Sequence, residues 1–261
     1  MKHGKVTLVG AGPGDPELLT VKAVKALQAA SVVLVDDLVS DGIVGLARPG
    51  TRIVYVGKRG GCKSTPQAFI HKLMLAAARD GETVVRLKGG DPFIFGRGGE
   101  EVEHLRAAGI EVAVLNGITS GLAAATALGV PLTHRAYAQG VVFVTGHAKR
   151  GGEATDWRVL AATAHSARLT LVIYMGVSGA LRVQDELLTG LPADTPVAVV
   201  QNASLPDQRH VTCELGQLAQ TITREKISSP AIIVVGEVTR AAALAAQAAS
   251  SAKDALRHGS G

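Results

Sequence analysis

The sequence predicts an α/β protein made of two α/β domains with mostly parallel sheets. Short runs of β-branched residues alternate with longer segments whose apolar residues recur at three- and four-residue spacing, the pattern of strands alternating with amphipathic helices. The expected strands are apolar almost without interruption, as in a parallel sheet covered on both faces. Two such series follow one another. We therefore expect an N-terminal domain over residues 1–134, a C-terminal domain over residues 135–240 and a helical or disordered tail over residues 241–261.

The first series predicts five strands with helices between them. The helical segments read "PELLTVKAVKALQAA", "TPQAFIHKLMLAAARD" and "GGEEVEHLRAAG", each with apolar residues on one helical face. The expected strands are Lys5–Gly10, Val32–Asp36, Arg52–Gly57, Thr83–Lys88 and Glu111–Asn116.

The second series begins after "PLTHRAYAQG" and also predicts five strands. The segment His210–Leu215 alternates between apolar and polar residues, so we expect it to pair antiparallel or to lie at a sheet edge. The expected strands are Val141–Gly146, Leu169–Gly176, Pro196–Gln201, His210–Leu215 and Ala231–Gly236.

The composition argues against a nucleic-acid or membrane partner. The formal net charge is +5, but no cluster of Lys and Arg is interleaved with aromatic residues, so we expect no nucleic-acid partner. A scattered basic excess fits an acidic small molecule, or only a slightly basic surface. No apolar run approaches the ~18 residues of a membrane helix, so no membrane partner is expected. Cys62 and Cys213 form no disulfide framework and the N-terminus lacks a signal-peptide pattern; both predict a cytoplasmic protein.

The loop "VGAGPGDPELLT" after the first strand is rich in glycine but does not fit a dinucleotide site. That motif needs glycine at its first, third and sixth positions. Gly10 and Gly12 match, whereas the sixth position is Asp15. Pro13 has no N–H to donate to a phosphate. The loop is either a plain strand-to-helix turn or suited to a neutral or cationic ligand.

The stretch "RLKGGDPFIFGRGGEE" places glycines, a carboxylate and an arginine at the end of a predicted strand, where open α/β sheets bind ligands. Gly89 and Gly90 permit close approach of a ligand, and Asp91 can accept hydrogen bonds. Arg97 lies between two glycines, so nothing bulky adjoins its guanidinium. Glu101 is expected in the first turn of the next helix, in a capping role. A plain turn is again the simpler interpretation.

In "NGITSG", Thr119 and Ser120 are expected at a helix N-cap, where they also can touch a ligand. The eight histidines show neither HExxH nor Cys/His spacing, so we expect no metal site.

These loops, in this order, resemble the tetrapyrrole methylases. The resemblance covers about Lys5 to Val238, and "RLKGGDPFIFGRGGEE" with "PLTHR" favours the branch that acts on uroporphyrinogen. The matching stretches are "VGAGPGDPELLT", "DDLVS", "VGKRGG", "VVRLKGGDPFIFGRGGEE", "GITS", "GVPLTHR", "FVTGH", "YMG" and "SPAIIVVGEV".

The resemblance implies a homodimer of two α/β domains with S-adenosylmethionine in a cleft between them and no metal. This methyl donor carries no phosphate, which agrees with Pro13 and Asp15 in the first loop. Carried over by position, the residues that would line the donor site are Pro13, Gly89, Gly90, Asp91, Thr119, Ser120, Met175, Ala203 and Ala231.

The implied reaction is methyl transfer to C2 and then C7 of uroporphyrinogen III, a small-molecule tetrapyrrole with eight carboxylates, giving precorrin-2. Asp36 corresponds to the family's proposed proton acceptor and Lys58 to its proposed donor. Arg97, which is assigned to the catalytic set, Glu100 and Arg135 would face the tetrapyrrole.

Three stretches depart from the family's usual pattern. Val35 and Asp37 flank Asp36 where tyrosine and arginine are usual, and Lys63 stands where a histidine is usual. Asn116 with Gly117 occupies the approach to "GITS" that usually holds proline. We expect these changes to affect the orientation of the bound substrate and the efficiency of the reaction more than the fold.

Other functions remain open on sequence alone. A related methylase acting on a later precorrin of cobalamin biosynthesis is the nearest, followed by a methylase of ribosomal RNA and by a non-catalytic S-adenosylmethionine-binding module. A nicotinamide-dependent oxidoreductase is disfavoured by Asp15.

Overall fold

The computed structural model describes residues 4–57, 65–147 and 155–240. The chain forms two compact units, Met1–Ser120 and Gly121–Gly261. This division places most of α5 (Ser120–Ala127) in the second unit, whereas the sequence-based boundary falls after residue 134. The boundaries at residues 134 and 240 therefore stay predictions, and the expected tail lies outside the described residues.

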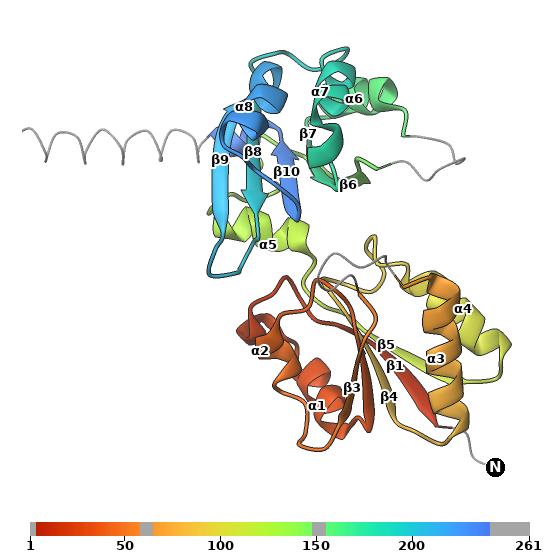
Figure 1. The fold of residues 1–261 in the computed structure, drawn as a ribbon. Helices are drawn as coiled ribbons and strands as arrows, with labels where there is room; N and C mark the ends of the chain where they lie inside the picture. Colours follow the sequence, from red (N-terminus) through yellow and green to blue (C-terminus); the bar gives the residue numbers. More distant parts are fainter. Residues whose placement is uncertain (1–3, 58–64, 148–154, 241–261) are drawn as a thin grey trace, which may run out of the picture. The chain divides into compact units, whose positions relative to one another are not determined.

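The first unit holds an all-parallel sheet in the strand order β3-β2-β4-β1-β5 (Figure 1). All five expected strands of this series are confirmed, with ends that differ by at most two residues. The strands are β1 (Lys5–Gly10), β2 (Val32–Val35), β3 (Arg52–Tyr55), β4 (Val84–Lys88) and β5 (Glu111–Leu115).

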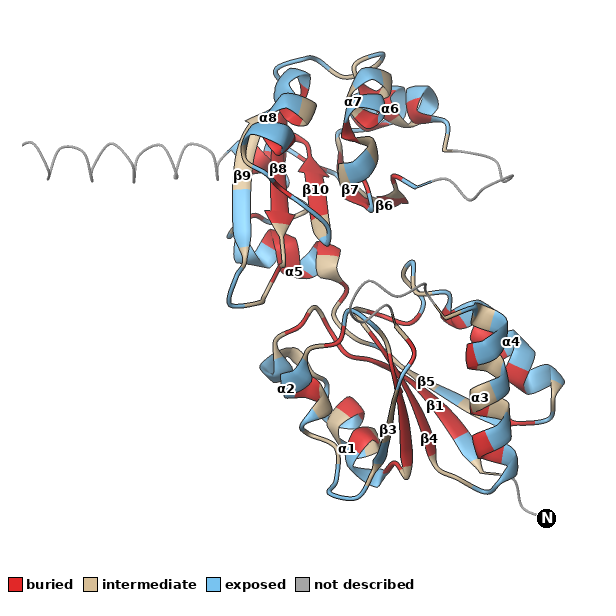
Figure 2. Ribbon diagram, viewed as in Figure 1, coloured by how far each residue is buried: buried red, intermediate tan, exposed pale blue. Residues whose placement is uncertain are grey.

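Helices cover both faces of this sheet. On one face, Val32 and Leu34 pack in a cluster with side chains of α3 (Gln67–Arg79) and α4 (Gly98–Ala107). On the other, Val33 and Val35 pack against α1 (Val21–Ala29) and α2 (Asp41–Val44), which follow the short 3-10 turn η1 (Pro16–Leu18). Successive residues of a strand point to opposite faces, so burial on both sides explains the near-continuous apolar runs of the inner strands β1, β2 and β4. Figure 2 draws β1 and β4 mostly red, and the edge strands β3 and β5 mostly tan and pale blue.

The second unit holds a mixed sheet in the order β6-β7-β10-β8-β9. Among the described residues only the β6–β7 pairing is parallel, and β7–β10, β10–β8 and β8–β9 are antiparallel. The expectation of a mostly parallel sheet is thus wrong here. The strands are β6 (Gly140–Thr145), β7 (Leu169–Tyr174), β8 (Pro196–Gln201), β9 (Arg209–Glu214) and β10 (Ala231–Val235).

The prediction failed because an apolar run in the sequence indicates that a strand is buried but does not indicate the direction in which the strand runs. β10 lies in the middle of the sheet and is buried, whichever way it runs. The segment between β8 and β9 is too short for the crossover of a dozen or more residues that a parallel pairing needs. The alternating strand β9 does lie antiparallel at the sheet edge, as predicted.

Helices also pack on this second sheet. Side chains of α6 (Trp157–Ser166), α7 (Ala180–Leu187) and α8 (Leu218–Arg224) share one cluster with Leu171 and Ile173 of β7. Short 3-10 turns precede α7 and α8 and follow β10, at Val177–Gly179, Leu215–Gln217 and Glu237–Thr239. None of the helices in the described ranges has the length and apolarity needed to cross a membrane.

Candidate active site

The loops after β1, β4 and β5 contact one another at the edge of the first sheet where the strands have their carboxyl ends. Gly12 and Gly90 exchange backbone hydrogen bonds, with N–O distances of 3.1 and 2.7 Å. A methyl group on Gly117 would lie 2.2 Å from the carbonyl oxygen of Gly90, so no side chain fits between these two loops. The carboxyl ends of parallel strands meet at this edge, where open α/β sheets bind ligands.

Asp91 ties the β4 loop to the β5 loop. Its side chain is buried, and its carboxylate accepts hydrogen bonds from the Asn116 side chain at 3.1 Å, the Gly117 amide at 3.1 Å and the Phe93 amide at 2.8 Å. Asn116, which departs from the family pattern, therefore contributes a hydrogen bond that proline cannot make. Asp91 fixes the loops that surround a ligand, in addition to any contact of its own with one.

The structure brings the predicted donor residues of the first unit to this one edge. Pro13 directly follows Gly12, and the backbone of Thr119 lies 3.8 Å from where a side chain on Gly90 would begin. Thr119 is buried, and Ser120 is the first residue of α5. Gly89 lies between Lys88 and Gly90 in the same loop.

The three predicted donor residues of the second unit also share an edge, that of the second sheet. Met175 follows β7, Ala203 follows β8 and Ala231 opens β10. β10 runs antiparallel to both of its neighbours, with Ile232 opposite Tyr174 and Ala231 opposite Gln201. The carboxyl ends of β7 and β8 therefore lie beside the amino end of β10.

The backbone at this second edge is strained, a feature that sequence reasoning missed. Met175, Asn202 and Ser204 have φ of 53°, 52° and 71°, a left-handed conformation that non-glycine residues seldom adopt. The side chain of Asn202 donates to Asp207 at 2.7 Å, and the Asn202 amide donates to the Pro230 carbonyl at 3.1 Å. Such strain is common at ligand sites. In the sequence only Asn202 indicated it, because asparagine adopts positive φ more readily than most other residues.

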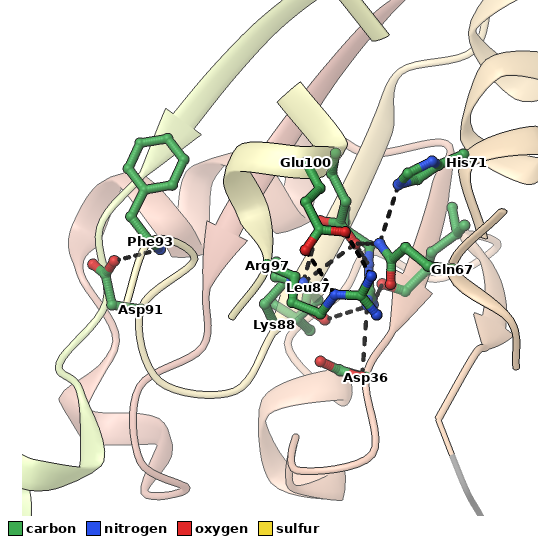
Figure 3. A network of polar contacts seen from close by, with 12 residues as sticks. Asp36, Gln67, His71, Leu87, Lys88, Asp91, Phe93, Arg97 and Glu100 are labelled. Atoms are coloured by element: carbon green, nitrogen blue, oxygen red, sulfur yellow. Dashed lines mark hydrogen bonds and ion pairs between the residues drawn. The ribbon is translucent and has the colours of Figure 1, made fainter. Parts of the chain in front are cut away.

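Arg97 and Glu100, both predicted to face the substrate, form an ion pair (Figure 3). Nε of Arg97 lies 3.0 Å from one carboxylate oxygen and Nη2 lies 2.5 Å from the other. The two side chains are 56% and 53% exposed, so the pair is at the surface and is weak enough to rearrange. The hydrogen bonds that Arg97 donates to Glu100 raise the pKa of Arg97 above its ordinary value.

Arg97 owes its position to its glycine neighbours. It caps α4 in a left-handed conformation with φ 58°, and a methyl group on Gly98 would lie 2.4 Å from the Pro92 carbonyl oxygen. The loop therefore folds back on Pro92 only when residue 98 has no side chain.

The remaining predicted residues are placed as follows. Asp36 follows β2 with its side chain 37% exposed, and Arg135 lies on an exposed turn of the second unit. Lys58, the predicted proton donor, and Lys63 lie outside the described residues.

A buried ionic cluster lies beside Asp36, and the sequence analysis did not find it. Glu101 is fully buried, and one of its oxygens accepts from Nε of Arg86 at 3.1 Å and from Nζ of Lys88 at 3.3 Å. Nη2 of Arg86 lies 3.6 Å from Oδ1 of Asp36. Glu101 was expected to cap α4; its side chain instead turns inward to the two cations of β4. The available signal was two basic residues at alternate positions of an apolar strand.

Further groups extend this cluster toward α3. Gln67 donates to Glu101 at 2.9 Å and lies 3.2 Å from Nε2 of His71, which stacks on His104 with ring centroids 4.5 Å apart. Burial lowers the pKa of Lys88, and Arg86 lowers it further against the opposing effect of Glu101 and Asp36. Burial, followed by the neighbouring His104, also lowers the pKa of His71.

Curated relatives and solved structures are similar along most of the chain. A uroporphyrinogen-III C-methyltransferase of Pseudomonas aeruginosa is 55% identical over 238 residues, which are 91% of this chain and 95% of the relative. A siroheme synthase of Aeromonas hydrophila is 51% identical, and the chain spans only 50% of its length.

The fold is also that of solved structures. A uroporphyrin-III C-methyl transferase from Thermus thermophilus, complexed with S-adenyl homocysteine, matches with a TM-score of 0.77 and 45% identity over 91% of this chain and all of that one. A cobalt precorrin-4 methyltransferase matches with a TM-score of 0.79 and 31% identity over 90% of this chain and 95% of that one. The model of the Tetrapyrrole (Corrin/Porphyrin) Methylases matches residues 5–219, and the chain belongs to this family.

Proposed function

We propose that this protein is a uroporphyrinogen-III C-methyltransferase, which transfers methyl groups from S-adenosylmethionine to C2 and then C7 of uroporphyrinogen III and yields precorrin-2. The observation that carries the proposal is the 55% identity to a relative of that name, over nearly the whole length of both chains. A relative at 45% identity was solved with the demethylated form of the same donor.

The strand-end loops fit such a donor. S-adenosylmethionine carries an ammonium, a carboxylate and a ribose but no phosphate, so it does not need the N–H groups that Pro13 lacks. Gly89 and Gly90 present backbone without side chains, and the buried Asp91 holds these loops in register. When bound, the donor supplies an electrophilic methyl group on a sulfonium. The proposed contacts are Pro13, Gly89, Gly90, Asp91, Thr119, Ser120, Met175, Ala203 and Ala231.

The protein's part in the reaction is mainly to position the two reactants. A pyrrole carbon of a porphyrinogen is already nucleophilic, because the ring is electron-rich, so alignment of carbon, methyl and sulfur accounts for much of the catalysis. Asp36, one third exposed at the end of β2, accepts a proton from the substrate. Arg97, in the catalytic set, binds and orients a substrate carboxylate, with Glu100 and Arg135 in the same substrate site. Lys58 is the proposed proton donor.

Assembly and location belong to the same proposal. We expect a homodimer in the cytoplasm, as the resemblance to the family and the cysteine content suggest. Light scattering of the purified protein in line with gel filtration tests the first point, because a monomer at micromolar concentration would contradict it.

An anaerobic turnover assay tests the activity. Pure protein is incubated with uroporphyrinogen III and S-adenosylmethionine, and products are identified by absorbance and mass, which resolve zero, one and two added methyl groups. We expect precorrin-2 or its oxidised form from the wild type and a loss of roughly 10²-fold or more in kcat for Asp36→Asn. Methylation of a later precorrin, but not of uroporphyrinogen III, would assign the protein to a different branch of the family.

A further inference from the structure

The buried cluster on the first sheet contains an uneven set of charges. Arg86 and Lys88 on β4 are 2% and 3% exposed, and Glu101 on α4 is 0% exposed. These three groups carry two positive charges and one negative charge. A buried ion without a counter-ion is strongly unfavourable, so a second anion is expected close to the two cations.

Asp36 supplies that second negative charge. Its Oδ1 lies 3.6 Å from Nη2 of Arg86, and its charge also acts on Lys88. Counted over the described residues, the cluster with Asp36 included has two cations and two anions and is neutral. Asp36 is also the member that reaches solvent, with its side chain 37% exposed.

Glu101 determines which way Arg86 faces. A guanidinium is planar and rigid, so fixing some of its nitrogens fixes the rest. Nε donates to Glu101 at 3.1 Å, and Nη1 makes longer contacts with the carbonyls of Leu34 and Leu87, at 3.5 and 3.4 Å. Nη2 is thereby directed at Asp36.

We propose that Glu101 is a positioning residue for methyl transfer: through Arg86 and Lys88 it sets the direction in which the Asp36 carboxylate is held and the net charge that Asp36 faces. This inference rests on the proposed function, in which Asp36 accepts the substrate proton. Glu101 itself touches neither reactant, since it is fully buried.

Other charged groups face the cluster from both neighbouring helices. Arg97 and Glu100 of α4 and the stacked His71 and His104 lie on the side of Glu101, and Asp37 adjoins Asp36 in the chain. All of them are unchanged in the variants below, so comparison with the wild type removes their effect.

Two single variants give opposite predictions. Glu101→Gln leaves two cations beside Asp36, which favours its ionised form, so the acid limb of the kcat–pH profile moves roughly one unit to lower pH. The plateau of kcat falls about tenfold, because Asp36 held by an unshared Arg86 is a weaker base. Lys88→Met removes a cation instead, so the acid limb moves to higher pH.

The double variant Lys88→Met/Glu101→Gln restores neutrality, with Arg86 opposite Asp36. We expect its acid limb to return to within roughly a third of a pH unit of the wild type. A merely structural cluster predicts the reverse, since removing two members of a packed network damages it more than removing one. Glu101→Asp, which keeps the charge and shortens the side chain, lowers kcat without moving the acid limb.

The measurement is kcat at saturating donor and tetrapyrrole across the acid range, with S-adenosylhomocysteine binding by calorimetry as the check on folding. The matched control is Glu103→Gln, which removes one charge from the exposed face of α4 and leaves the profile unchanged. Acid limbs that stay in place, or that move in the same direction in both single variants, overturn the inference.

The outcomes for inference and function are separable. An active wild type whose variants show no opposite shifts refutes only the role of Glu101, whereas a wild type without methylated product refutes the proposed function and this inference with it. If Glu101→Gln fails to bind S-adenosylhomocysteine, the profiles of Lys88→Met and Glu101→Asp decide the question.

Discussion

The position of the Arg97 side chain depends on the absence of side chains on the two residues next to it in the chain. Glycines on both sides let the chain turn back on the Pro92 carbonyl oxygen, and Arg97 accepts a left-handed backbone at the start of α4. The side chain then meets Glu100 in a two-point contact at the surface. A substrate carboxylate can take the place of Glu100, because an exposed ion pair contributes little stability.

Replacing Arg97 by lysine tests this two-point recognition. Lysine has the same backbone preferences and charge, but it binds a carboxylate through one point rather than a planar fork. We expect Arg97→Lys to raise KM for uroporphyrinogen III about tenfold, the equivalent of roughly 1.4 kcal/mol, with little change in KM for S-adenosylmethionine. Steady-state kinetics with each reactant varied in turn measures both values.

The control for this experiment is Arg106→Lys, on the exposed face of the same helix, which should leave both KM values as they are. An unchanged KM for the tetrapyrrole in Arg97→Lys would show that Arg97 does not bind a substrate carboxylate.

At the scale of elements, a histidine takes part in the contact between α3 and α4. His71 and Gln67 on α3 and Glu101 on α4 form a chain of hydrogen bonds, in which Nε2 of His71 faces the Gln67 amide. That amide donates to Glu101, so it is compatible with an unprotonated Nε2. Protonation of His71 would place two donors face to face and disturb the Gln67–Glu101 bond.

The sign of the resulting pH dependence follows from the lowered pKa of His71. Burial first, then His104, holds this pKa below its value of 6.5 in the unfolded chain, so the unfolded state binds the proton more readily. Stability is then full above that unfolded value and falls as pH drops below it. We expect amide protection factors in α3 to fall between about pH 7.5 and pH 5.5, and to fall less in His71→Gln.

Hydrogen exchange followed by mass spectrometry or NMR measures those protection factors, and amides of α6 in the second unit serve as the internal reference. Equal pH dependence in the wild type and in His71→Gln would show that the α3–α4 contact does not sense this histidine.

At the scale of the whole molecule, the positive net charge of the protein affects how strongly it attracts its substrate. The formal net charge of +5 attracts a macrocycle with eight carboxylates, and salt screens that attraction beyond about 10 Å at 0.1 M. The methyl donor carries charges of both signs and is attracted less.

Kinetics at two ionic strengths test the effect of this charge. Between about 0.05 and about 0.5 M salt, we expect KM for uroporphyrinogen III to rise severalfold, while KM for S-adenosylmethionine changes much less. A tetrapyrrole KM that is independent of salt would limit recognition to close contacts such as that of Arg97.

The sequence by itself determined where the strands lie and which loops follow them. All ten predicted strands occur, because apolar runs bounded by glycine and polar residues report burial directly. It also placed Gly90, Asp91 and Thr119 at strand ends, and the structure brings these three to one sheet edge because parallel strands end together.

Only the tertiary structure decided strand direction in the second sheet and the partners of buried ions. β10 is apolar whether it runs parallel or antiparallel, so its direction follows from connections and pairing that a local pattern does not contain. Glu101 was expected to cap a helix, because the alternate basic residues of β4 indicate buried charge but do not show which acidic residue pairs with Arg86 and Lys88. The local sequence indicates how deeply a residue is buried. It does not indicate that Glu101 is the counter-ion of Arg86, fifteen residues away, because the packing of α4 on β4 brings these two residues together.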